Sequence, residues 1–436
     1  AYSKLERELN LENGGVKLPK TTADLAPEDY LTGLIGRKVS FSPTETLFIP
    51  GRANIVLRRM TDLEMITEQQ RQQAEAELSG LEFTKHIETI RAAHHFVFEI
   101  RRQIEEKFGK ELVAQGGLQV HTTLDPDLQQ AAEDALTEQI KISKETHGVS
   151  TGAVFAVDAK TGEILAMVGS ADYFDEEAHG NVNHVFAKRQ PGSSFKPIIY
   201  AKAFLNNFAP STVLYDTPTD FGANYKPQNY EGLFKGPMSI RTALGQSRNI
   251  PAIKAYFLAG QQEEIIPFAL KLGISSLDPK GDYGPPLAIG AGETTLAQMV
   301  EAFSVFANGG IRRQPFAITK IQDRDGDMLY ERTKDEVPEQ QALDPQIAYL
   351  ITNILSDKSV WLGPRLDVPG HTTAAKTGTS NKELSPTKIL PSNLWTVGYT
   401  PSVVAGVWAG NSDGGALKTN ADGYNVAAPI WAKVMK

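Results

Sequence analysis

The sequence has 436 residues and no cysteine, which excludes disulfide frameworks, thiolate nucleophiles and cysteine-ligated metal centres. Its 44 Lys and Arg against 52 Asp and Glu give a net charge of −8, so we expect no nucleic-acid partner held by a basic surface. No stretch reaches the roughly 18 apolar residues of a membrane span. The sequence starts at Ala1 without a basic and then apolar leader, so we expect a trimmed chain without its targeting or anchoring segment.

The N-terminal third has little that predicts a core. Residues 1–66 mix polar stretches with Pro and Gly before a short run of apolar residues at helical spacing. Thr67 is a predicted helix N-cap, with Gln70 at the reciprocal position of a capping box. We interpret residues 67–147 as a linker of charged surface helices. Its second half predicts a short strand and an amphipathic helix, over residues 118–123 and 127–140.

The remaining residues, 148–436, predict one α+β domain. Apolar runs of strand length at 153–157 and 164–168 flank a polar, Gly-containing connection, which is typical of a β-hairpin. Helical patterns concentrate between residues 194 and 308. Further strands are predicted over residues 316–323, 328–330, 372–377, 395–399 and 403–408. Strands at both ends with helices between them indicate an antiparallel β-sheet covered by helices.

Three short patterns are candidates for nucleophilic chemistry. Without cysteine, the candidate nucleophiles are Ser, Thr and Lys, and each needs an activating partner at a defined spacing. The patterns occur in the order Ser193-Ser194-Phe195-Lys196, Ser247-Arg248-Asn249 and Lys376-Thr377-Gly378.

The first pattern has the spacing that a serine and its base require. If a helix begins at Gly192 and Ser193, then Ser193 and Lys196 share a face, and the helix N-terminus favours a developing negative charge. A lysine acts as a base only when neutral, which requires burial or a nearby cation to lower its pKa from about 10.4. Lys376 is the candidate cation.

The sequence contains a second copy of two of these patterns. Residues 385–388 form another S-x-x-K in a polar, Pro-containing stretch, for which we expect a solvated loop. Residues 160–162 form another K-T-G in the predicted hairpin turn, where an exposed lysine is expected. Residues 376–378 instead continue a predicted strand, and Gly378 would let a substrate backbone approach closely. A single motif therefore decides nothing.

The ordered set resembles the S-x-x-K, S-D-N and K-T-G motifs of serine penicillin-recognising enzymes. The flanking residues resemble class A penicillin-binding proteins in particular, over roughly residues 52–436. They are Arg189-Gln190-Pro191-Gly192, Tyr225-Lys226-Pro227-Gln228-Asn229-Tyr230, Arg241-Thr242-Ala243-Leu244 and Phe306-Ala307-Asn308-Gly309-Gly310. The middle motif here is S-R-N, and we expect Arg248 to be an exposed filler.

The resemblance also implies a domain organisation. Class A members pair an N-terminal glycosyltransferase domain with a C-terminal transpeptidase domain, but the E-D-x-x-F-x-x-H-x-G signature of the former is absent here. We therefore predict a C-terminal remnant of that domain over 1–66, the linker over 67–147 and the transpeptidase domain over 148–436. The resemblance implies a membrane-anchored parent protein on the extracytoplasmic face of the bacterial cytoplasmic membrane, working in cell-wall synthesis complexes.

The resemblance assigns roles to the matching residues. It makes Ser193 the nucleophile, Lys196 its general base and Ser247 a proton relay. Lys376 would keep Lys196 neutral, and Asn249 would hold the substrate amide. Substrate binding would further involve Thr377, Gly378 and Thr379. The backbone N–H groups of Ser193 and Thr379 would form an oxyanion hole. No metal or cofactor is expected.

The implied reaction is D,D-transpeptidation of peptidoglycan stem peptides through an acyl-enzyme on Ser193, which β-lactams would trap. A D,D-carboxypeptidase and a non-catalytic penicillin-recognising sensor or scaffold remain as alternatives. A β-lactamase with a dedicated carboxylate is disfavoured, because no E-x-x-x-N pattern lies between Asn249 and Lys376.

Overall fold

The computed structural model divides the chain into two compact units, Ala1–Thr89 and Ile90–Lys436. It describes residues 37–40 and 46–49 as backbone, and further residues 51–79, 93–223, 225–333, 336, 339–360, 363–385 and 387–436. The boundary between the units falls inside the predicted linker, and the assignment of 1–66 to a glycosyltransferase remnant stays a prediction. Among the described residues, no helix combines the length and apolar character needed to span a membrane.

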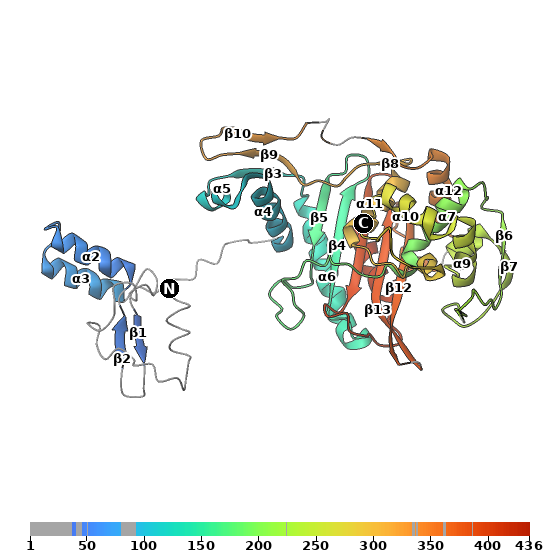
Figure 1. Cartoon of the computed structure of the whole chain (residues 1–436), viewed down its shortest axis with the longest axis horizontal. Helices are drawn as coiled ribbons and strands as arrows, with labels where there is room; N and C mark the ends of the chain where they lie inside the picture. The colour runs from blue at the N-terminus through green and yellow to red at the C-terminus, as the bar shows by residue number, and fades with distance from the viewer. Residues whose placement is uncertain are drawn as a thin grey trace. The chain divides into compact units, whose positions relative to one another are not determined.

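The smaller unit contains a β-hairpin and two helices (Figure 1). Its elements are β1 (Arg37–Ser40), antiparallel to β2 (Thr46–Ile49), α2 (Arg52–Asp62) and α3 (Glu68–Ser79). The backbone N–H of Thr67 donates to Gln70 Oε1 at 2.8 Å, and the N–H of Gln70 donates to Thr67 Oγ1 at 3.2 Å. The predicted capping box is therefore confirmed.

The larger unit is built on a five-stranded antiparallel sheet (Figure 1). In spatial order its strands are β12 (Ala374–Ser385), β13 (Lys388–Tyr399), β14 (Val403–Gly410), β4 (Thr151–Asp158) and β5 (Ile164–Val168). The first and last parts of this unit thus meet where β14 pairs with β4. The predicted antiparallel sheet is confirmed, and β12 lies at one of its edges.

Helices cover both faces of this sheet. On one face, Phe155 and Trp395 of the strands share a core with helices α7 (Lys196–Leu205), α8 (Ile240–Gly245), α9 (Asn249–Leu258), α10 (Gln261–Lys271), α11 (Leu296–Ala307) and α12 (Pro345–Leu355). On the other face, Val154 shares a core with α6 (Pro126–His147) and α13 (Ala428–Val434). Because successive strand residues point to opposite faces and both faces are covered, β4 is buried from Thr151 to Val157, with a continuous apolar run at 153–157.

Short elements complete the larger unit. A second sheet has the order β10 (Met328–Glu331), β9 (Ile318–Gln322), β3 (Gln119–Thr122). Two-stranded pairs are β6 (Val213–Asp216) with β7 (Gly236–Ser239) and β8 (Ile311–Arg312) with β11 (Gln340–Gln341). The remaining elements are α4 (His94–Phe108), α5 (Lys110–Gln115), the 3₁₀-helices η3 (Gly192–Phe195), η4 (Pro285–Ile289) and η6 (Pro364–Leu366), and the π-helix η7 (Gly423–Ala427).

One helix of the predicted linker packs into the larger unit. The charged face of α4 is exposed, as expected of a surface helix, but Phe96, Ile100 and Ile104 on its other face are buried in the core of the larger unit. The heavily charged sequence of α4 contains a single apolar stripe, because the three residues recur at a spacing of four.

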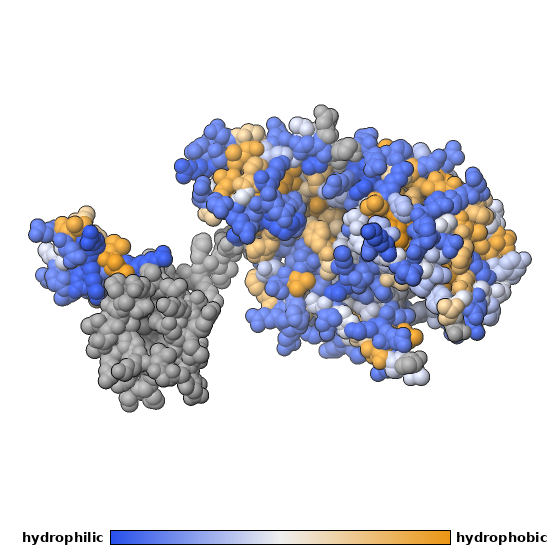
Figure 2. All heavy atoms as spheres, in the orientation of Figure 1, coloured by the Kyte–Doolittle hydropathy of each residue, from blue (hydrophilic) through white to orange (hydrophobic). Residues whose placement is uncertain are grey.

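In the view of Figure 2, apolar residues form separate patches among hydrophilic ones on the surface.

Candidate active site

Ser193 lies in a 3₁₀ turn that runs directly into α7. The prediction that a helix begins at Gly192 and Ser193 is confirmed, with η3 as its first turn. Gly192 has φ +56°, and a Cβ atom there would overlap the backbone of Thr379 on β12. Only glycine therefore lets this turn pack directly onto the edge strand. Ser193 is half-buried, and Lys196 follows it by one turn.

Lys196 is completely buried. Its Nζ donates to the backbone oxygen of Ser247 at 2.6 Å and to Asn249 Oδ1 at 2.8 Å, and it lies 3.4 Å from Ser247 Oγ. Burial lowers the pKa of Lys196 well below its usual 10.5, and the nearby cations Lys376 and Arg248 lower it further. A neutral amine has two N–H donors and one lone pair, so it can make the two short bonds and still accept a proton.

Ser247 lies between the two lysines, at the turn from α8 to α9. It has φ +58°, a left-handed conformation that costs a non-glycine residue about 1–3 kcal/mol and that needs support from its surroundings. Its Oγ accepts a hydrogen bond from Lys376 Nζ at 2.7 Å. Asn249 begins α9, and its Nδ2 donates to the backbone oxygen of Gln228 at 2.8 Å while its Oδ1 holds Lys196.

Lys376 comes from the edge strand β12 and is also buried, with 3% of its surface exposed. Burial lowers its pKa to about 7. Besides Ser247, its Nζ contacts the backbone oxygen of Thr377 at 3.0 Å. Thr377 itself is buried, and the hydroxyl of the half-buried Thr379 accepts a hydrogen bond from the N–H of Gly423 at 3.1 Å. The three motifs, which contain Lys196, Ser247 and Lys376, thus meet at one edge of the sheet.

Gly378 is constrained by the protein's own backbone. A Cβ atom at this position would overlap the carbonyl oxygen of Pro191 and lie 3.0 Å from the backbone nitrogen of Ser194. The close neighbour in the structure is therefore the turn that carries Ser193. The role of Gly378 in admitting a substrate backbone stays a prediction.

The second copies of the motifs lie elsewhere. Residues 385–388 connect β12 to β13, and Lys388 is exposed. Lys160 is exposed in the turn between β4 and β5, where Asp158 Oδ1 accepts its backbone N–H at 2.8 Å. The expected exposed lysine in a turn is confirmed for residues 160–162. The copy at 385–388 also lies at the surface, but Ser385 and Lys388 are paired strand residues and not part of a loop.

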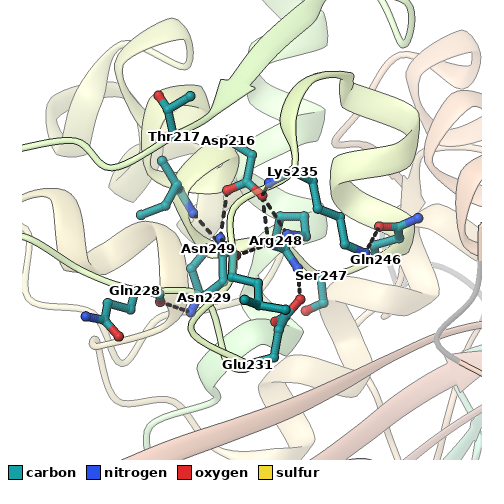
Figure 3. A network of polar contacts seen from close by, with 12 residues as sticks. Asp216, Thr217, Gln228, Asn229, Glu231, Lys235, Gln246, Ser247, Arg248 and Asn249 are labelled. Carbon is teal, nitrogen blue, oxygen red and sulfur yellow. Dashed lines mark hydrogen bonds and ion pairs between the residues drawn. The ribbon is translucent and has the colours of Figure 1, made fainter.

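The prediction for Arg248 is wrong. Its side chain is 3% exposed and forms a buried ion pair with Asp216, within a network that also contains Asn229 and Glu231 (Figure 3). The sequence carries no signal for this network, because its members come from β6, a connecting loop and the turn before α9, without a common spacing. Among the described residues, no cluster of three or more His, Asp or Glu side chains is arranged to hold a metal ion.

A serine on a helix start, a buried lysine three residues later and a K-T-G edge strand together are typical of serine-type penicillin-recognising enzymes. Residues 152–436 match the family described as "Penicillin binding protein transpeptidase domain". The chain belongs to this family.

Individual relatives agree with this membership. The chain is 30% identical over 400 residues to penicillin-binding protein 2D of Bacillus subtilis, a match that covers 88% of this chain and 55% of that protein. It is 33% identical over 300 residues to penicillin-binding protein 1A of Neisseria meningitidis, covering 65% of this chain and 35% of that protein. The chain thus spans about half or less of these relatives' lengths.

Solved structures show the same fold. The penicillin-binding protein PonA1 from Mycobacterium tuberculosis superposes with a TM-score of 0.69 at 23% identity, over 79% of this chain and 91% of that chain. Penicillin-binding protein 1A from Haemophilus influenzae superposes with a TM-score of 0.67 at 22% identity, over 88% of this chain and 75% of that chain. The predicted fold class is confirmed.

Proposed function

We propose that the chain is a serine-type D,D-transpeptidase that cross-links peptidoglycan stem peptides and that β-lactams inhibit covalently. The observation that carries this proposal is the position of Ser247. Its hydroxyl accepts a hydrogen bond from Lys376, and its carbonyl accepts one from the buried Lys196. Lys196 itself follows Ser193 by one helical turn. This arrangement supplies a hydroxyl nucleophile, a lysine whose environment favours the neutral amine, and a second lysine that holds the intervening serine.

In the first half-reaction, Ser193 Oγ attacks the carbonyl carbon between the two terminal D-alanines. Lys196 takes the hydroxyl proton, Ser247 gives its own proton to the leaving nitrogen, and Lys196 returns a proton to Ser247, so that D-alanine departs as an amine, an ester remains on Ser193 and Lys196 is neutral again. The N–H groups of Ser193 and Thr379 stabilise the oxyanion, by about 3 kcal/mol per donor in comparable sites. Asn249 holds the peptide amide.

In the second half-reaction, the amine of a neighbouring stem peptide attacks the ester. Lys196 takes a proton from this amine and returns one to Ser193 Oγ, so the nucleophile is regenerated. Thr377 and Thr379 bind the terminal carboxylate of the donor peptide before acylation, and Gly378 leaves room for its backbone. A β-lactam occupies the same position, and its opened ring stays attached to Ser193.

The wider setting follows from the family resemblance. We infer that residues 1–66 are the end of a glycosyltransferase domain, 67–147 a linker and 148–436 the transpeptidase domain. The parent protein would be anchored on the outer side of the bacterial cytoplasmic membrane, within cell-wall synthesis complexes.

Mass spectrometry after penicillin treatment tests the proposal. We expect one long-lived adduct on the peptide that contains Ser193, its loss in Ser193→Ala and its retention in the matched control Ser385→Ala. No adduct in the unmodified chain would indicate a non-catalytic scaffold, and rapid loss of the adduct would indicate a hydrolase. With a stem pentapeptide and an acceptor amine, release of D-alanine without a cross-linked product would indicate a carboxypeptidase.

A further inference from the structure

The turn that carries Ser247 and Asn249 has two sides. Toward the candidate active site, the Ser247 carbonyl and the Asn249 side chain hold Lys196. The side chain of the intervening Arg248 enters a polar network with the buried Asp216 and Asn229 and the exposed Glu231; these four residues are here called the rear network (Figure 3). The second motif is thus held from both sides.

Arg248 is fixed at every nitrogen of its guanidinium group. Its Nε and Nη2 lie 2.9 Å and 2.7 Å from Asp216 Oδ2, and Asp216 is fully buried. Its Nη1 contacts Glu231 Oε1, and its Nη2 donates to the backbone oxygen of Leu233 at 2.5 Å. A planar group with this many partners has one orientation only, which a lysine ammonium would not have.

The same carboxylate also fixes the start of α9. Asp216 Oδ1 accepts a hydrogen bond from Asn229 Nδ2 at 2.7 Å. Asn229 Oδ1 in turn accepts the backbone N–H of Asn249 at 2.8 Å, which satisfies one of the free donors at the helix N-terminus. One buried carboxylate therefore holds the residues on both sides of the peptide bond that joins Arg248 to Asn249.

Stability alone gives little reason for such a network. A buried ion pair is often no more stabilising than apolar residues of the same volume, because both charges must be desolvated. A strained residue, by contrast, keeps its conformation only where its neighbours determine it, and Ser247 has φ +58°. Arg248, the residue directly after Ser247, belongs to the rear network.

We propose that the rear network is a positioning device for the second motif, which holds the Ser247 hydroxyl between Lys196 and Lys376. Arg248 touches no substrate and acts through its neighbours. The proposal rests on the proposed function, because its effect is measured on acylation of Ser193.

The charges around Lys196 give the direction of the expected effect. Charged groups act on it from three segments: Lys376 on β12 and Arg248 before α9 lower its pKa, and Glu231 in the loop before β7 raises it. Removal of the Arg248 charge therefore raises the pKa of Lys196. The neutral fraction at a given pH falls, and the acid limb of the pH–rate profile moves to higher pH.

The test is the rate of acylation by a fluorescent penicillin, measured across pH. For Arg248→Met we expect a rate about 10- to 100-fold lower, since small displacements of catalytic groups can cost about 100-fold, and an acid limb at higher pH. Arg248→Lys keeps the charge and should return the limb to its original pH without restoring the full rate. The double variant Asp216→Asn/Arg248→Met removes both charges of the pair, so neither position keeps an unpaired buried charge. It should therefore be more stable than Arg248→Met and still show the acid limb at higher pH.

A matched control separates positioning from stability. Arg312 and Glu301 form another largely buried pair, at 2.8 Å, between β8 and α11. Arg312→Met should lower the unfolding temperature and leave the pH profile unchanged. The unmodified chain and the double variant could both be acylated with the same rate and the same pH–rate profile. That result would overturn the positioning role and leave the proposed function standing. If the unmodified chain forms no adduct, the proposed function itself fails.

Discussion

The two S-x-x-K segments of this chain have the same pattern and opposite surroundings. At 193–196 the pattern spans the start of a helix, and Lys196 is completely buried, with a pKa that burial and the charges of Lys376 and Arg248 lower. At 385–388 it spans a β-hairpin turn, and Lys388 is exposed. The two K-T-G segments differ in the same way, since Lys376 is buried and Lys160 is exposed. Burial is what makes a lysine a candidate base, because desolvation disfavours its charged form.

The largest expected difference within these pairs concerns the two S-x-x-K lysines. Lys196→Ala should lower the rate of acylation by penicillin about 10²- to 10⁴-fold, the usual contribution of a general base. Lys388→Ala should leave the rate unchanged, because its amine is in solvent. Stopped-flow fluorescence with a labelled penicillin measures both. Equal rates for the two variants would show that burial does not distinguish the segments.

The two K-T-G lysines should differ by somewhat less. Lys376→Met removes the donor to Ser247 Oγ and one cation near Lys196, so we expect acylation to fall about 10²- to 10³-fold, as for other preorganised donors. Its acid limb should move to higher pH. Lys160→Met should behave like the unmodified chain. An unshifted limb in Lys376→Met would mean that Lys376 does not influence the charge of Lys196.

The glycines of the two K-T-G segments sharpen the comparison further. Gly378→Ala places a Cβ atom on the Pro191 carbonyl, so the turn that carries Ser193 must move, and a shift of about 1 Å can lower the rate about 100-fold. Gly162 has φ +80°, so Gly162→Ala should lower stability by about 1 kcal/mol without changing acylation. Acylation rates and thermal unfolding of both variants test this. Unchanged acylation in Gly378→Ala would contradict the close approach.

Much of the larger unit could be predicted because its local signals agree with its tertiary packing. The apolar runs of β4 and β5 predicted strands, and turn residues separated the surface copies of the motifs from 193–196 and 376–378. Strand β12 extends beyond its predicted end, however, because residues 381–383 are polar and exposed and carry no apolar signal. Backbone pairing with β13 continues the hairpin there.

The burial of charge could not be predicted in the same way. Arg248 has no apolar neighbour pattern, and its partner Asp216 precedes it by 32 residues, at the end of strand β6. A charged side chain is expected to be exposed, and only the folded structure shows that a buried carboxylate pairs with this one. The sequence therefore identifies the residues that chemistry needs more readily than those that hold them in place.

The smallest expected effect is on stability, and it also separates buried from exposed lysines. Lys376 has a pKa of about 7 in the folded state against 10.5 when unfolded, and the pKa of Lys196 is lowered in the same direction. Between about pH 7 and 10 the unfolded chain therefore binds more protons, and the free energy of unfolding should rise with pH, by up to about 1.4 kcal/mol per pH unit for each lysine. The buried histidines His95 and His184 do not contribute there, because their pKa values of about 4 and about 3 and the usual 6.5 all lie below this range.

Denaturant unfolding at pH 7, 8 and 9 measures this slope. Lys376→Met has no ammonium to bury, so its slope should be smaller than that of the unmodified chain and its stability at pH 7 relatively higher. Lys388→Met removes an equally basic lysine from an exposed site, where folded and unfolded states have similar surroundings, and should keep the original slope. If both variants had the same slope, the lowered pKa of Lys376 would be contradicted, and with it the view that burial separates the two kinds of segment.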